Sequence, residues 1–282
     1  GTGGDTNAND GVFSATIPGS QFNEGEMVRW FVTAEENTGT ISREPRFASP
    51  LNSPEYHGTI TGNPAITGQL PVVHWFTANP SAATTPTGTR SSLYFNGEFY
   101  DNVFSRRRGH FGSTLVPKKS PKFDFNPGHH FRILPDERRV EEINLNTTDP
   151  DKSYLRQILS WDLYETAGVP GSMSFMMRLE QNGSFWGVST FVEQPDEDFL
   201  RREPLLDDDG ALYKMYGRMT AANQGEKKTR QDEDNADLAA LIAGISQADP
   251  EARRVFVYDA VDLAAMANFA AAMFITAGLD CC

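Results

Sequence analysis

Residues 174–193 read SFMMRLEQNGSFWGVSTFVE, and this stretch predicts a long β-hairpin. Two runs rich in aromatic and β-branched residues flank Asn182-Gly183, a pair that tolerates the positive φ angles of a type I′ turn. Asn96-Gly97 separates a second pair of runs, SSLYF and EFYDNVF, in the same way. The sequence therefore predicts an antiparallel sheet that contains these two hairpins.

A helix is predicted between the two hairpins. We expect Asp149 to cap its N-terminus and Pro150 to occupy its first turn, because these residue types suit those positions. Gly168, followed by Pro170, is expected to end it. Its apolar face consists of Leu155, Ile158, Leu159 and Leu163. The predicted sheet is thus covered by one helix.

Helical spacing replaces the strand pattern after the segment GALYK. One apolar series consists of Leu238, Leu241, Ile242 and Ile245, and a second of Leu263, Met266, Ala270 and Met273. We expect Asp259 to cap the second helix. Residues 223–237 are highly charged and predict a solvated loop that includes Lys227 and Lys228. Because strands come first and helices second, the predicted fold class is α+β.

The N-terminal residues predict a separate all-β segment. VFSATIP and EGEMVRWFVTAEENTG alternate apolar and polar residues between Gly, Pro and Asn turn signals. These strands are too few to close a sandwich, so we interpret residues 1–60 as the C-terminal part of a β-sandwich module. Residues 61–71 are rich in Gly, Pro and Thr and predict a linker. Residues 72–282 form the main predicted domain.

Composition limits the classes of function. The chain has 282 residues, 39% of them hydrophobic, and a net charge of -13 at pH 7, which favours a globular protein and disfavours a general nucleic-acid binder. The most apolar run, residues 261–279, contains Asp262 and Asn268, so no membrane span is predicted. The first ten residues show no signal-peptide pattern. Cys281 and Cys282 are adjacent and cannot form a useful cross-link.

Residues 106–125, RRRGHFGSTLVPKKSPKFDF, are the main candidate for a ligand site. Small residues at Gly109, Gly112 and Ser113 would let backbone N–H groups approach phosphate oxygens. Positive charge would come from Lys118, Lys119 and Lys122. The alternative interpretation is a glycine-containing surface turn flanked by solvated basic side chains.

Other polar residues have ordinary structural explanations. Glu193 ends a strand that should be buried, so we expect it to have a compensating partner or to lie at the sheet edge. The acidic run at residues 207–209 could chelate a metal, but the following glycine favours a solvated turn. His129 and His130 have no Cys or His at ligand spacing, which disfavours a zinc site and predicts exposed loop residues.

The order of several segments resembles the CotH family of spore-coat and surface proteins over about residues 70–282. These segments are NVFSRRRGHFGS with VPKKSPKFDF, DKSYLRQILSWDLYETAG, RLEQNGSFWGVSTFVEQPDEDFL, GALYK and VDLAAMANFAAAMFITAGLD. The resemblance implies an atypical protein kinase with an altered kinase fold, in which a β-rich nucleotide lobe with one covering helix precedes a helical lobe. Such a kinase uses ATP and magnesium to phosphorylate Ser or Thr of coat proteins.

The resemblance also implies roles for individual residues. The residues that it places over the ATP phosphates are Arg108, Gly109 and Ser113. Lys119 or Lys122 would pair with the phosphates as the strand lysine of a kinase does. Lys119 is favoured, but Pro121 departs from the family pattern and leaves this register open. Glu193 would lie where the chain passes the nucleotide base. Residues that match the family's helix motif are Asp151, Ser153 and Arg156.

Asp280 would begin the catalytic loop and serve as the catalytic base. In the family an Asn and a second Asp follow this residue and complete the metal site, so the magnesium ligands are expected beyond Cys282 and are unknown from this sequence. The chain is therefore expected to be an inactive fragment of an ATP-dependent Ser/Thr kinase. Its partner would be a Ser/Thr-rich surface or coat protein.

The N-terminal all-β segment resembles the immunoglobulin-like or fibronectin-like domains that precede CotH regions in large bacterial surface proteins. This resemblance implies a location outside the cytoplasm or at the cell surface. The alternative function is a non-catalytic surface scaffold or adhesion protein that retains the fold. Nucleotide binding separates the two hypotheses.

Overall fold

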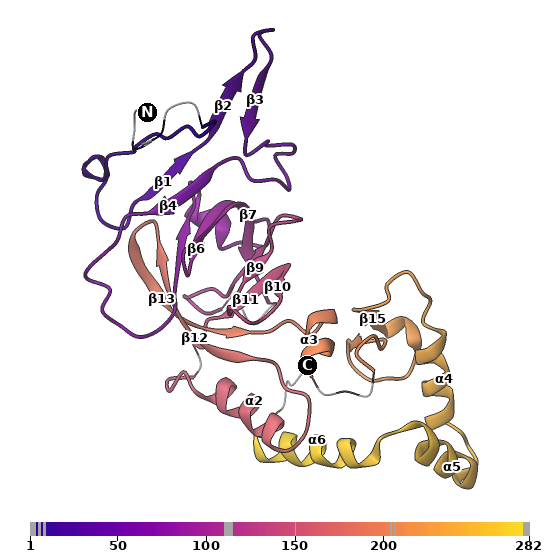
Figure 1. Ribbon diagram of the computed structural model, residues 1–282. Coiled ribbons are helices and arrows are strands. Elements are labelled where there is room, and N and C mark those ends of the chain that lie inside the picture. The colour runs from indigo at the N-terminus through magenta and orange to yellow at the C-terminus, as the bar shows by residue number, and fades with distance from the viewer. Residues whose placement is uncertain are drawn as a thin grey trace.

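Seven strands close into a barrel in the computed structural model, which describes residues 4, 7, 10–109, 115–149, 151–203, 205 and 207–278 (Figure 1). The strand order is β11-β13-β12-β5-β6-β7-β8. The strands are β5 Val72–Phe76, β6 Thr89–Phe95, β7 Glu98–Arg107, β8 Pro121–Asp124, β11 Glu142–Asn146, β12 Ser174–Gln181 and β13 Ser184–Val192. Neighbours are antiparallel, except that β12 and β5 are parallel. Short elements between them are α1 Pro80–Ala83, β9 Phe131–Arg132 and β10 Arg139–Val140.

Both predicted hairpins are confirmed. β6 and β7 pair up to Phe95 opposite Glu98, and β12 and β13 pair up to Gln181 opposite Ser184. Each turn has positive φ at Asn and Gly, 46° and 87° in the first and 52° and 78° in the second, as a type I′ turn requires. The Asn-Gly pairs thus set the register of four barrel strands.

Inward-facing side chains fill the barrel. The large residues that are at most 2% exposed are Val73, Trp75, Leu93, Phe95, Tyr100, Val103, Phe123, Phe131, Ile143, Leu145, Met177 and Leu179. Within each strand they occupy alternate positions wherever the strand is regular, because successive side chains point to opposite faces. Burial of each such side chain stabilises the fold by about 1.5–3 kcal/mol. The side chains between them on the same strands point away from the barrel interior.

Helices dominate the chain after the barrel. The elements in this part are α3 Glu197–Arg202, β14 Tyr213–Met215, η3 Ala222–Gln224, β15 Gly225–Lys227, α4 Ala236–Ile245, α5 Pro250–Ala260 and α6 Leu263–Ile275. The predicted α+β class is confirmed. The predicted cap at Asp259 is wrong, because Asp259 lies inside α5 and the Asp262 carboxylate accepts from the Ala265 N–H at 2.9 Å. Sequence reasoning missed α5, although Asp249-Pro250 is a helix-start signal.

No single helix among the described residues is long and apolar enough to cross a membrane. The helices α5 and α6 pass that test only as a pair, and they are bent by 89° where they meet.

The helix predicted between the two hairpins, α2 Arg156–Thr166, begins later than predicted. The Asp151 carboxylate, rather than Asp149, accepts hydrogen bonds from the N–H groups of Ser153 at 3.0 Å and Arg156 at 2.8 Å. Tyr154 has a φ of 62°, which is incompatible with a helix that starts earlier. The predicted apolar face is also wrong in part, because Leu159 is 59% exposed. Instead α2 packs on α6 through a cluster that contains Tyr164 and Ala272.

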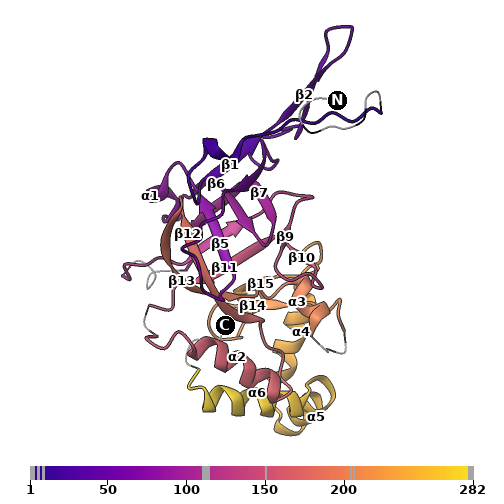
Figure 2. The ribbon, with the colours of Figure 1, turned by 60° about the vertical axis from the view of Figure 1, so that its left-hand side comes forward.

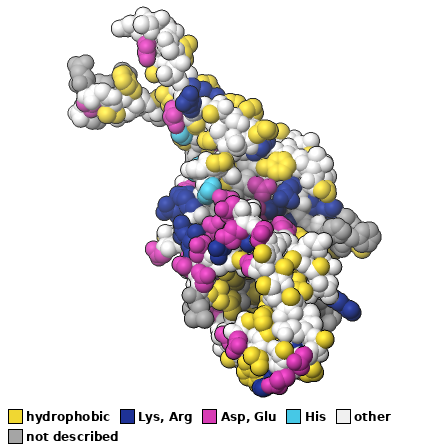
Figure 3. Space-filling model, turned by 90° about the vertical axis from the view of Figure 1, so that its right-hand side faces the viewer, with side chains coloured by type: hydrophobic (Ala, Val, Ile, Leu, Met, Phe, Trp, Pro, Cys, Tyr) yellow, Lys and Arg dark blue, Asp and Glu magenta, His cyan; other side chains and the backbone are white. Residues whose placement is uncertain are grey.

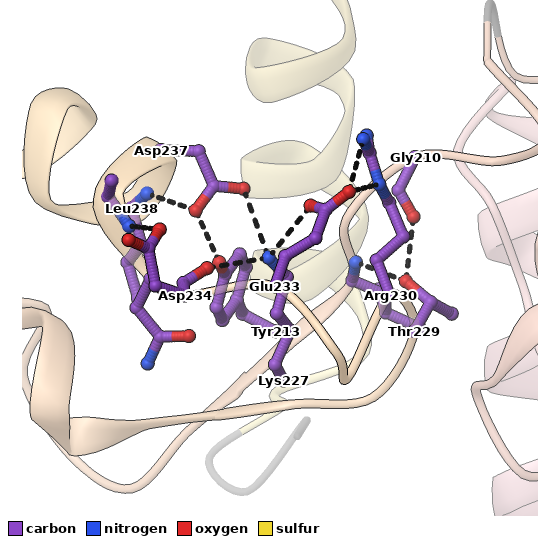
Figure 4. A network of polar contacts seen from close by, with 12 residues as sticks. Gly210, Tyr213, Lys227, Thr229, Arg230, Glu233, Asp234, Asp237 and Leu238 are labelled. Carbon is purple, nitrogen blue, oxygen red and sulfur yellow. Dashed lines mark hydrogen bonds and ion pairs between the residues drawn. The ribbon is translucent and has the colours of Figure 1, made fainter.

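The prediction of a solvated loop at residues 223–237 is confirmed for the exposed residues 230–234 and wrong for Lys227. Lys227 belongs to β15, its side chain is 6% exposed, and its Nζ lies 3.3 Å from Glu233 and 3.9 Å from Asp237 (Figure 4). The Tyr213 hydroxyl donates to the same Asp237 carboxylate. These contacts join β14, β15 and α4, so the charged residues of this segment form an ordered polar network.

The N-terminal segment contains η1 Gly19–Gln21 and two small sheets, β1 Met27–Trp30 with β4 His57–Ile60 and β2 Val32–Glu35 with β3 Ile41–Glu44. The β2–β3 hairpin projects at one end of the molecule, opposite α5 and α6 (Figures 1 and 2). Asp101 of β7 anchors this segment, because its carboxylate accepts from the N–H groups of Glu55 and Tyr56 at 2.9 Å each. The interpretation of residues 1–60 as the end of a sandwich module, with a linker at 61–71, stays a prediction.

Gly244→Ala is expected to lower the free energy of unfolding by roughly 1–3 kcal/mol, the range for an overpacked core site. A Cβ atom at Gly244 of α4 would overlap the Phe256 ring of α5. Urea denaturation should show the loss, and Phe256→Leu in the Gly244→Ala background should recover part of it. Equal stability of Gly244→Ala and the parent would contradict this packing.

Candidate functional site

The candidate site lies on the outer face of β8, β11 and β13. Lys122, Asn144 and Val192 stand opposite one another on these strands. They alternate with the inward-facing Phe123, Ile143 and Phe191. We call this surface the outer-face site. Its polar side chains are those of Arg108, Lys122, Glu142, Asn144, Asn146 and Gln194.

Lys122 has carboxylate partners on two strands. Its Nζ forms an ion pair with Glu142 of β11 and lies 3.5 Å from Asp124 of β8. The Lys122 side chain is 15% exposed, so this ion pair is more strongly coupled than one in open solvent. The site therefore holds a fixed lysine at the middle of the outer face.

Arg108 follows the end of β7 and reaches the same face. Its Nη1 donates to Asn146 Oδ1, and its backbone N–H donates to the Ser120 carbonyl at 2.8 Å. Burial lowers the pKa of Arg108, and the negative charge of Glu142 opposes this shift. Arg108 stays protonated, because a free guanidinium titrates far above neutral pH. Glu142 of β11 pairs with Lys122, and Asn146 of the same strand accepts from Arg108, so β11 contacts both predicted phosphate-binding cations on one face.

The other two lysines bond to the backbone. Lys118 Nζ donates to the Val188 carbonyl of β13 and lies 5.2 Å from the centroid of the Tyr154 ring. Burial lowers the pKa of Lys118, while Asp149 opposes this shift. Lys119 Nζ donates to the Val116 carbonyl. Of the two lysines that the sequence offered for the phosphates, Lys122 is the one beside the strand carboxylates.

Glu193 lies between β13 and α3, and its side chain is held by Arg202. The Arg202 Nε lies 3.1 Å from both Glu193 carboxylate oxygens, and Nη2 lies 2.6 Å from one of them. The Met173 N–H also donates to Glu193, at 3.0 Å. Glu193 therefore has the compensating partner that its buried position predicted. Arg202 also contacts Glu203 at 2.7 Å and Glu165 at 3.7 Å.

Sequence reasoning missed Glu142, Asn144, Asn146 and Gln194. Asn144 is 3% exposed, and its Nδ2 donates to Gln194 Oε1 at 2.7 Å. The residues of β11 alternate apolar Ile143 and Leu145 with polar Asn144 and Asn146, which is the signal for one buried and one functional face.

A pocket of about 450 Å³ adjoins the outer-face site. Its wall includes Glu142 of β11, Gln194 and Asp196 before α3, and Lys228 after β15. On the face shown in Figure 3, acidic and basic side chains gather side by side in the middle of the molecule. The pocket therefore lies between the barrel and the helical part and has walls of mixed charge.

Asp196→Asn is expected to raise the free energy of unfolding at pH 7.5, by on the order of 1 kcal/mol. Burial, with the nearby charges of Asp198 and Glu193, raises the pKa of Asp196 from 3.8 to about 6. Ionisation of this carboxyl therefore costs stability above pH 6, and the parent recovers it as the pH falls from 6 toward 4. Asn keeps the capping oxygen, which accepts from Asp198 N–H at 2.9 Å. Thermal unfolding between pH 4 and 8 should show an advantage of the variant that disappears in acid. A variant less stable than the parent at pH 7.5 would contradict this assignment.

The remaining predicted residues have the following positions. Gly109 is exposed just after β7, with a φ of 86°. Ser113 and Asp280 lie outside the described residues. Residues 207–209 are exposed, as expected for a solvated turn.

The prediction that His129 is an exposed loop residue is wrong, because its ring stacks on Tyr100 with the centroids 5.0 Å apart. Within the described part of the chain, no three His, Cys, Asp or Glu side chains are grouped to hold a metal.

Comparison with known protein families gives one match. A family model described as CotH kinase protein matches residues 105–281, which is more than half of the chain. The matched residues run from the end of β7 past α6 and include every polar residue of the outer-face site. No curated protein matches the chain.

Proposed function

Because the chain belongs to the CotH kinase protein family, we propose that it belongs to an ATP-dependent protein kinase that phosphorylates Ser or Thr of surface or coat proteins. In this proposal the barrel is the nucleotide lobe, α2 is its covering helix, and the elements from α3 to α6 begin the helical lobe of an atypical kinase-like fold. A location outside the cytoplasm or at the cell surface is part of the same proposal.

The observation that carries this proposal is the contact of β11 with both cations, through the Glu142 ion pair to Lys122 and the Asn146 hydrogen bond from Arg108. Protein kinases hold the phosphates of ATP with a strand lysine that is itself paired with a glutamate. Here Lys122 is on a strand, and its glutamate comes from the neighbouring strand β11. We therefore assign the phosphate-binding role to Lys122 with Arg108, and we place Lys119 beside them as a secondary contact.

The chain's other residues have these proposed roles. Backbone N–H groups at Gly109 and Ser113 would donate to phosphate oxygens, as small residues in such a segment permit. The connection at Glu193 and Gln194 would pass the nucleotide base. Asp280 would accept the proton of the attacking Ser or Thr hydroxyl, which is the task of the catalytic aspartate in a kinase. Each of these groups positions a reactant or stabilises charge.

Magnesium would neutralise charge on the transferred phosphoryl group when it is bound. The described residues include no group of three His, Cys, Asp or Glu that could hold the ion. We therefore assign no magnesium ligand in this part of the chain.

Calorimetric titration with ATP, ADP and adenosine tests the proposal. We expect a Kd for ATP between about 1 μM and 1 mM, the range in which enzymes usually bind substrates. Affinity should fall from ATP to ADP to adenosine, because Arg108 and Lys122 attract the phosphates. If ATP does not bind at about 1 mM, the non-catalytic scaffold hypothesis is favoured instead.

A further inference from the structure

A chain of three side chains joins α2 to the outer-face site. Asn146, at the end of β11, accepts a hydrogen bond at Oδ1 from Arg108 Nη1. Its Nδ2 donates to Gln157 Oε1 of α2, at 2.9 Å. The Asn146 side chain therefore contacts α2 through its NH₂ group and Arg108 through its oxygen.

The direction of these hydrogen bonds matters. A side-chain amide has an acceptor oxygen on one side and donor hydrogens on the other. The Arg108 guanidinium has donors only, so it needs the oxygen of Asn146. Gln157 presents its own oxygen and so requires the NH₂ group of Asn146. Without Gln157, the Asn146 amide could turn over and present hydrogens to Arg108, which would repel the guanidinium.

We propose that Gln157 is a positioning residue that holds Arg108 in place through Asn146, so that α2 controls how strongly the site binds the phosphate groups. This inference rests on the proposed function, because the phosphate chain of a nucleotide is the ligand concerned. Gln157 itself touches no phosphate in this scheme. Its effect on binding therefore has to disappear when Arg108 is absent.

The N-terminal end of α2 has fixed contacts that make such control possible. The Asp151 carboxylate binds the N–H groups of Ser153 and Arg156, and Tyr154 lies against Lys118. Gln157 follows directly after this turn, and its Oε1 accepts from Asn146 at the end of β11. A displacement of α2 would separate Gln157 from Asn146 before it affected the barrel core.

A double-mutant cycle tests this inference. Four proteins are needed, namely the parent, Gln157→Leu, Arg108→Ala and the double variant, each titrated by calorimetry with inorganic tripolyphosphate and with ATP. We expect Gln157→Leu to weaken tripolyphosphate binding about five- to tenfold, the size of a lost hydrogen bond between two uncharged amides. In the Arg108→Ala background the same substitution should change the affinity less than twofold.

Ser160→Ala is the control on the same helix, because its hydroxyl donates to the Arg156 carbonyl of α2, at 2.7 Å, and not to the outer-face site. It should bind both ligands as the parent does. Thermal unfolding confirms that each variant is folded, and Gln157→Met replaces Gln157→Leu if the latter is not. Equal losses in both Arg108 backgrounds, or no loss in either, would overturn the positioning role while the proposed function stands. A parent that binds neither ligand would overturn the proposed function and this inference together.

Discussion

Lys122→Ala is expected to weaken ATP binding by about ten- to a hundredfold, which corresponds to the loss of one charge-assisted contact in a partly closed site. Lys122 is 15% exposed, stands on β8 and pairs with Glu142. Its removal takes away a positive charge that would face the phosphates and leaves Glu142 without its nearest cation. Both changes weaken the attraction for an anion. Calorimetry with ATP measures the effect.

Lys214→Ala is the control for that experiment. Lys214 is exposed on β14, and its Nζ lies 5.2 Å from the centroid of the Tyr216 ring. A solvated lysine of this kind contributes little to binding, and salt screens it. Lys227 would be a poor control, although the sequence suggested it, because its side chain is 6% exposed in the network of Figure 4. If Lys122→Ala binds ATP as tightly as Lys214→Ala does, the assignment of the phosphate site is wrong.

Local signals were sufficient to predict the two hairpins. Asn-Gly sets the turn type through positive φ at neighbouring residues, and the alternating flanks set the strands, so no distant contact is needed. The start of α2 could not be found in this way. Asp149-Pro150 predicts an earlier start, but Tyr154 is left-handed and α2 begins after Leu155, where the Asp151 carboxylate accepts from the Arg156 N–H. The surrounding fold, and not the local sequence alone, therefore decides at which residue α2 begins.

The charged segment before α4 was misread for a different reason. The Lys227 side chain is 6% exposed because Glu233 and Asp237, which follow β15, and Tyr213, its partner across the β14–β15 pair, lie around it. Composition alone assigns such a segment to solvent, because it counts charges and not their pairing. Sequence reasoning missed the other polar residues of the outer-face site, Glu142, Asn144, Asn146 and Gln194, because their grouping depends on strand register. Register across β8, β11 and β13 brings them together, and a single strand does not reveal register.

Arg202→Met is expected to lower the free energy of unfolding by about 3–5 kcal/mol, the usual cost of removing one partner from a buried ion pair. The substitution would leave Glu193, 11% exposed, and Glu203, 6% exposed, without their guanidinium. Burial already raises the pKa of Glu203, against the attraction of Arg202. Arg201→Met is the matched control on the same helix, because Arg201 pairs with Glu197 and Asp198 at the surface. That variant should lose less than about 1 kcal/mol in urea denaturation.

The origin of the loss can be separated from simple loss of packing. If uncompensated charge is the cause, Glu193→Gln and Glu203→Gln added to Arg202→Met should recover part of the stability, because neutral amides cost less to bury than carboxylates. The deficit of Arg202→Met should also shrink as the pH falls toward 4, because protonation removes the charge of the buried Glu203, whose pKa burial raises. A deficit that is equal at pH 4 and pH 8, and equal to that of Arg201→Met, would contradict the ion-pair explanation. Glu193 begins the connection from β13 to α3, which in the proposed function passes the nucleotide base. The ion pair with Arg202 therefore holds the first residue of that connection in place.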